Sequence, residues 1–152
     1  MKSLANSEDR SDLLVRVTSL RADSQRRWGK MSAHQMLCHL NDAFLICMGG
    51  RQVSPATGIF QRTVIKFGAL YAPIKWPKGF PTRPEMEQGV GGTAPIEFET
   101  DRSTLIKTME RFWNPECDRT RNPHPVFGDL RDREWLRWGY LHVDHHFRQF
   151  GL

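Results

Sequence analysis

The chain has 152 residues, a length that fits one domain with a buried core of its own, so we expect a single domain over residues 1–152. The net charge of +5 permits contact with nucleic acid, but the basic residues are scattered and no nucleic-acid-binding motif accompanies them. We therefore expect no nucleic acid partner. The three cysteines, Cys38, Cys47 and Cys117, contain no CxxC pair, which argues against a disulfide framework or a cysteine zinc site.

The N-terminal segment MKSLANSEDRSDLL is polar where a signal peptide would be apolar, and the apolar runs elsewhere are too short to span a bilayer. These features predict a cytoplasmic protein without a membrane partner. We expect a small-molecule substrate, and the sequence leaves open whether the chain forms a homodimer.

Helical periodicity predicts a first helix from about Glu8 to Ala22. Its apolar face consists of Leu13, Leu14, Val17 and Leu20. A second helix is predicted from Ser32 to about Met48, because Ser32 and Gln35 have the spacing of a capping box. The pair Gly49-Gly50 is typical of a helix end.

The segment from Gly50 to Thr100 is rich in proline and glycine, which predicts a long connection with short helical turns and no sheet. A short helix is expected over residues 61–70. A third long helix is predicted from Asp101 to Trp113, capped by Thr100 or Asp101. The last helix is predicted to start near Leu130–Asp132 and to run almost to the end of the chain. We therefore predict an all-α four-helix bundle with a long connection between its second and third helices.

Two histidines of the last helix, His142 and His146, are four residues apart and therefore stack on one helical face. A helical wheel places them in the same inward arc as five neighbours, Trp135, Trp138, Gly139, Gln149 and Phe150. A buried polar ring without a partner costs about 1–3 kcal/mol, so both rings need a hydrogen bond or a metal. Gly139 leaves space beside them, either for substrate or for close helix packing.

His39 lies at the margin of the apolar stripe of the second helix, whereas His34 falls on its more polar side. The sequence thus favours His39, His142 and His146 as three ligands of one divalent ion, zinc or nickel, with a coordination position left open. A packed histidine cluster bonded to carbonyls and water is the alternative. An HExxH protease site is excluded, because Val143 follows the first histidine. We interpret Cys38 as a packing residue, with a redox role as the less favoured alternative.

The chain resembles the DinB/YfiT-like superfamily of metal-binding four-helix bundles. The resemblance rests on WGKMSAHQMLCHLND over residues 28–42, HPVFG over 124–128, and HVDHHFRQ over 142–149. In that family one metal ligand comes from the second helix and two come from the last helix with His-x-x-x-His spacing. Matched by position, these are His39, His142 and His146. The connection between Gly50 and Thr100 carries no motif of the family.

The resemblance implies a divalent metal and, from its characterised members, a transferase that activates a low-molecular-weight thiol as metal-bound thiolate. Bacillithiol, mycothiol and glutathione are the thiols it suggests as co-substrates. A metal-bound hydroxide would instead make the site a hydrolase. The alternative function is a metal- or ligand-binding stress-response bundle without turnover, which a fourth protein ligand such as His145 would favour. The sequence identifies no general base.

Overall fold

The computed structural model describes residues 1–56, 58–117 and 121–152, and within these residues it is all-helical, as predicted, without a strand. The elements are α1 (Ser7–Ser19), α2 (Ala33–Cys47), a π-helical turn η1 (Gln61–Ile65), α3 (Lys66–Tyr71), a 3-10 turn η2 (Pro84–Met86), α4 (Phe98–Trp113) and α5 (Asp132–Gln149). Among the described helices, none combines the length and apolar character needed to cross a bilayer.

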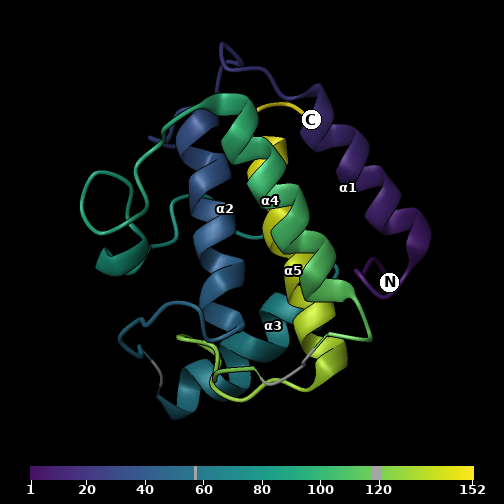
Figure 1. Ribbon diagram of the computed structural model, residues 1–152. Coiled ribbons are helices and arrows are strands. Elements are labelled where there is room, and N and C mark those ends of the chain that lie inside the picture. The colour runs from purple at the N-terminus through teal and green to yellow at the C-terminus, as the bar shows by residue number, and fades with distance from the viewer. Residues whose placement is uncertain (57, 118–120) are drawn as a thin grey trace.

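The four longer helices pack against one another, α2 on α4, α1 on α5, α1 on α4, and α2 on α5. Figure 1 shows α1 and α5 running in one direction and α2 and α4 in the other. Because α2 and α4 run the same way, the chain must return from the end of α2 to the level of its start. The connection through α3 and η2 makes this return along the side of α2 (Figure 1).

Two helix starts illustrate how local sequence positions the helices. Ser32 and Gln35 form the predicted capping box of α2, each side chain bonding the other residue's backbone N–H. The predicted cap of the third long helix was wrong, because α4 begins at Phe98 and its cap is Glu97. The Glu97 carboxylate accepts hydrogen bonds from the backbone N–H groups of Glu99 and Thr100. This leaves the carboxylate of Asp101 free to face α2.

The first helix is shorter than predicted. Helix α1 ends at Ser19, and Leu20 is already extended although its side chain is fully buried. The carbonyl of Leu20 accepts a hydrogen bond of 2.9 Å from Nη1 of Arg102 on α4. The bond from Arg102 to the Leu20 carbonyl is therefore present where the prediction continued the helix to Ala22.

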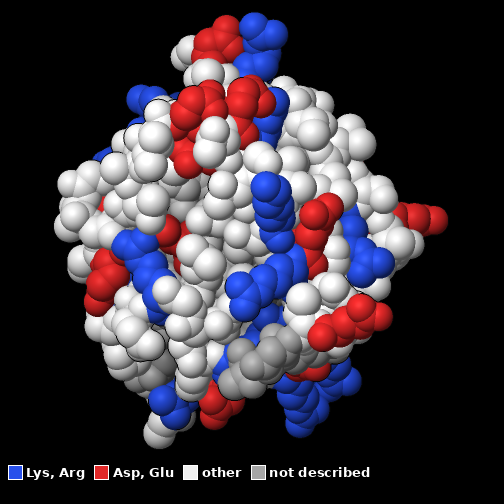
Figure 2. Space-filling view, viewed as in Figure 1, with Lys and Arg blue, Asp and Glu red and all other residues white. Residues whose placement is uncertain are grey.

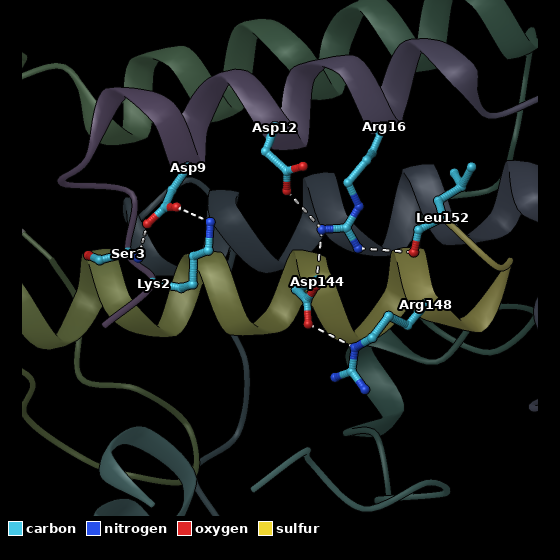
Figure 3. Close-up of polar contacts among 8 residues, drawn as sticks. All are labelled: Lys2, Ser3, Asp9, Asp12, Arg16, Asp144, Arg148 and Leu152. Atoms are coloured by element: carbon cyan, nitrogen blue, oxygen red, sulfur yellow. Dashed lines mark hydrogen bonds and ion pairs between the residues drawn. The ribbon is translucent and has the colours of Figure 1, made fainter. Parts of the chain in front are cut away.

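A network of charged side chains attaches α1 to α5 (Figure 3). Nη1 of Arg16 lies 3.2 Å from Asp12 on its own helix and 3.0 Å from Asp144 on α5. Nη2 of Arg16 donates to the carbonyl of Leu152 at 3.2 Å, and Asp144 also pairs with Arg148. Asp144 is two residues away from both His142 and His146, so its side chain leaves α5 on the side opposite to theirs. These contacts therefore hold the helix from that side.

The surface carries interspersed charges. On the face in Figure 2, Lys and Arg side chains lie among Asp and Glu side chains, apart from a short strip of basic side chains near the centre of the view. This matches the scattered basic residues of the sequence.

Gly139 is a close-packing position on α5, which decides between the two uses of its space that the sequence left open. A Cβ atom at Gly139 would lie 2.6 Å from Cδ1 of Leu4 and 3.3 Å from ring atoms of Phe44 and Phe112. The space above the glycine is therefore filled by core side chains, and the helices approach closely there.

We expect overpacking in Gly139→Ala to lower the free energy of unfolding by about 1–3 kcal/mol. This exceeds the gain of about 0.5–1 kcal/mol that alanine normally gives over glycine inside a helix. Gly68→Ala is the matched control, because nothing lies within 4 Å of its added Cβ. Urea unfolding of both variants measures the difference. A Gly139→Ala protein as stable as the Gly68→Ala protein would contradict the packing interpretation.

Candidate metal centre

Three histidines from two helices converge between α2 and α5. We call His39, His142 and His146 the histidine trio; each offers a ring nitrogen, and these atoms lie within 4.8 Å of one another. His39 and His146 are buried, with 4% and 8% of their surfaces exposed, and His142 is half-buried. The structure therefore brings together the three residues that the sequence selected as metal ligands.

The spacing between two members of the trio matches that of ligands in a tetrahedral metal site. Nε2 of His142 lies 3.2 Å from Nε2 of His146. Two nitrogens at the usual zinc distance of about 2.0–2.1 Å, separated by a tetrahedral angle, would be about 3.3–3.4 Å apart. The same separation also suits a hydrogen bond between two neutral rings, with one Nε2 carrying the proton. The donor set therefore fits a divalent ion with little movement of this pair.

Hydrogen bonds outside the trio orient two of its rings. Nε2 of Gln149 donates to the carbonyl of Trp28 at 2.9 Å, so Oε1 of Gln149 is the acceptor for Nδ1–H of His146 at 3.1 Å. Nδ1 of His39 lies 3.4 Å from the carbonyl of Met86, a long contact with the same role. Protons held on Nδ1 leave the Nε2 lone pairs available, as in metal sites whose histidines donate to outer partners.

Burial keeps the trio neutral. It lowers the pKa of His39, whereas the carbonyl of Met86 and the charge of Asp42 act in the opposite direction. The pKa values of His142 and His146 are well below the ordinary histidine value, again mainly because of burial and then because the neighbouring imidazoles repel a second positive charge. Neutral imidazole is the form that binds a metal ion.

His145 lies beside the trio but is not one of its converging ligands. Its ring centre is 5.3 Å from that of His146 and 6.1 Å from those of Trp28 and Trp76. Within the described residues, Nδ1 of His145 is a buried atom without a hydrogen-bond partner, and so is Nδ1 of His142. The trio is thus a three-ligand group with a polar ring next to it.

The proline-rich connection covers the site, which the sequence did not predict. The Trp76 ring lies 6.1 Å from the His142 ring, and its indole N–H donates to the carbonyl of Ala69 at 2.8 Å. On the other side, η2 brings the carbonyl of Met86 to His39. No motif in residues 50–100 indicated these contacts, because they depend on where the return segment lies in space.

A buried carboxylate fastens that cover. Asp42 is fully buried one turn after His39 and accepts hydrogen bonds from the backbone and hydroxyl of Thr93 at 2.8 and 2.6 Å. Arg51 pairs with Asp42 at 2.6 Å and donates to the carbonyl of Glu85 at 2.8 Å. The signal available in the sequence was the placement of Asp42 three residues after a candidate ligand, on the same helical face.

His34 lies in a different group, as its polar position on the helix predicted. Nε2 of His34 is 2.6 Å from Oδ2 of Asp101, and the Cys38 thiol contacts the same oxygen at 3.7 Å. The interpretation of Cys38 as a packing residue was therefore incomplete, because its sulfur also makes a polar contact. Burial and then the Asp101 charge raise the pKa of the Cys38 thiol to about 12.

Comparison with known proteins gives a family for the chain. A family model described as a protein of unknown function, DUF1569, matches residues 2–151. Searches of curated proteins and of solved structures gave no match.

A sixth histidine, His124, has a structural position in a tight turn. Its Nδ1 accepts the backbone N–H groups of Val126 and Phe127, both at 3.1 Å, and its backbone pairs with that of Gly128. Its ring stacks on Phe127 at 4.5 Å. Burial lowers the pKa of His124 to about 3.

Because the folded pKa of His124 lies below the unfolded value of about 6.5, the unfolded chain binds the proton first as the pH falls. His124 should therefore lower the free energy of unfolding by about 2 kcal/mol at pH 5 relative to pH 7. Above pH 7 its contribution should no longer change with pH. In His124→Asn, whose side-chain oxygen replaces Nδ1 as acceptor, that part of the pH dependence should disappear. Urea unfolding of the metal-free proteins at both pH values measures it; equal pH dependence in the two proteins would contradict the assignment.

Proposed function

This chain belongs to the DUF1569 family, whose description names no activity, and we propose from its site that the histidine trio binds one divalent ion, zinc or nickel. The observation that supports this most strongly is the convergence of three neutral imidazoles from α2 and α5, two of them buried and one half-buried. Two of them have their Nδ1 atoms directed to outer acceptors. A hydrogen-bonded histidine cluster would not need all three rings to converge.

We also propose that the four longer helices form a four-helix bundle of the DinB/YfiT-like type. The support is the origin of the trio, with one ligand on the second long helix and two on the last. The parallel course of α2 and α4, joined by a long return segment, agrees with this assignment. The bundle would be a cytoplasmic protein, since its three cysteines are free thiols, as expected in a reducing compartment.

The reaction that this site suits best is the transfer of a low-molecular-weight thiol to a small-molecule substrate. A divalent cation with three neutral ligands keeps its charge, which lowers the pKa of a thiol, or of water for hydrolysis, at its open position. The chain's own residues orient the ligands through Gln149 and the carbonyl of Met86. The rings of Trp28 and Trp76 flank His145, each with its centre 6.1 Å from the centre of the imidazole.

A binding role without turnover is the second candidate function. It is favoured by the connection that places Trp76 and Met86 beside the trio. Asp42 holds the end of this connection through Thr93. A substrate would have to enter past this segment. His145 would complete a closed site if its ring turned toward the ion, and a closed site has no position for a reacting group.

We expect His39→Ala, His142→Ala and His146→Ala each to abolish one zinc-binding event in isothermal titration of the metal-free protein, because two imidazoles hold zinc far more weakly than three. His34→Ala is the matched control for this one event, since it removes a histidine of α2 that lies outside the trio. His145→Ala distinguishes the two functions.

In that experiment, the His34→Ala protein must retain the event lost in the trio variants. Retention in His145→Ala supports the open, catalytic site, whereas its loss supports the closed, binding site. Undiminished zinc binding by His39→Ala would refute the assignment of the α2 ligand.

For the thiol reaction, we expect a thiol to bind at the open position of the cobalt-loaded protein and to produce sulfur-to-cobalt charge-transfer absorption. The test uses the Cys38→Ser variant, so that this buried thiol of α2 cannot contribute. Bacillithiol, mycothiol, glutathione and cysteine are titrated in turn, and His142→Ala is the negative control. If no thiol changes the spectrum, the transferase proposal fails, and hydrolysis or metal binding alone becomes the better account.

A further inference from the structure

A second group of potential metal ligands lies on another face of α2. His34 and Cys38 are four residues apart on α2, and Asp101 is in the first turn of α4. The ligand atoms of these three residues lie within 4.8 Å of one another. We call them the second ligand group. Its architecture repeats that of the trio, with an i, i+4 pair on one helix and a single ligand from the neighbouring helix.

The two groups are separated by the geometry of the helix. Cys38 and His39 are consecutive residues, so their side chains leave α2 about 100° apart. His39 is directed toward α5, whereas Cys38 is directed toward α4 and Asp101. A metal ion held by one group therefore shares no ligand with an ion held by the other.

The contacts in the second group meet at one oxygen. Oδ2 of Asp101 accepts from Nε2 of His34 at 2.6 Å, from the Cys38 thiol at 3.7 Å and from the backbone N–H of Ile96 at 2.9 Å. The Cys38 side chain is almost completely buried, and the side chains of His34 and Asp101 are 22% and 18% exposed. The group thus has a buried sulfur and a side open to solvent through which an ion can enter.

One of these distances is close to that between two ligands of a tetrahedral zinc ion, and the other is shorter. Sulfur and oxygen ligands of one zinc ion lie about 3.5 Å apart, near the 3.7 Å observed. Nitrogen and oxygen ligands lie about 3.3–3.4 Å apart, so the ring of His34 and the carboxylate would separate by about 0.7 Å. The backbone of Ile96 and the edge-on ring of Phe98, 5.5 Å from His34, already position two of the ligands.

We propose that His34, Cys38 and Asp101 form a second binding site for a divalent ion, which joins the start of α2 to the start of α4. Imidazole, thiolate and carboxylate together suit zinc and exclude hard ions such as magnesium. The site does not depend on the function proposed for the trio. An ion pair between His34 and Asp101 would explain their contact alone, but a metal site also accounts for the buried thiol aimed at the same carboxylate.

The test is a cobalt titration of the metal-free full-length protein under reducing conditions, without added thiol. Only a cysteine ligand gives sulfur-to-cobalt charge-transfer absorption, and the trio contains no sulfur. We expect this absorption in the wild type and its complete loss in Cys38→Ser. Cys117→Ser is the matched control and should keep it. His39→Ala should also keep it, so failure of the trio and failure of the second site are distinguished.

A second variant keeps the test decisive if Cys38→Ser does not fold. Asp101→Asn retains an oxygen for the N–H of Ile96 but lacks the carboxylate charge, and it should weaken cobalt binding at the sulfur site at least about ten-fold. Wild-type protein that binds cobalt without the absorption would overturn the proposal. Charge-transfer absorption that persists in Cys38→Ser would also overturn the proposal. The same holds if the Asp101→Asn protein reaches full absorption at the cobalt concentration that saturates the wild type.

Discussion

The burial of several imidazoles against each other constrains the rest of the structure. Rings that are shielded from water and close to one another must stay neutral, because a single charge would be poorly solvated and a second would be repelled. Each neutral ring then has one donor nitrogen that needs an acceptor, and one lone pair. Gln149 and Met86 take the donors of two rings. The lone pairs remain for a shared cation.

The rings can keep these positions only if the helices that carry them, α2 and α5, are held firmly in place. Gly139 permits the close approach of Leu4, Phe44 and Phe112 one turn before His142. On the outer side of α5, Asp144 pairs with Arg16 of α1. The helix that carries two of the three candidate ligands is therefore held from both faces, and a rigid element of this kind maintains the ligand spacing that a metal ion requires.

A single buried carboxylate holds part of the cover over the site against α2. Asp42 has Thr93 and Arg51 as partners, so it anchors residues from both ends of the proline-rich connection. Removing one partner would leave a buried charge uncompensated, which is costly. The position of Met86, whose carbonyl faces the trio, is thus coupled to the helix that carries His39, because Arg51 joins Asp42 to the carbonyl of the neighbouring Glu85. Access to the trio is set by this segment, whichever of the two functions applies.

The sequence by itself determined the elements with strong local signals. The capping box at Ser32, the helical spacing of His142 and His146, and the position of His39 on α2 are local relations within one helix, and the structure agrees with each. The partners of Cys38 and Asp42 and the packing around Gly139 were decided only by the tertiary structure. These contacts join residues tens of positions apart. Local periodicity specifies which face of a helix is inward, but the three-dimensional course of the connection decides what that face meets.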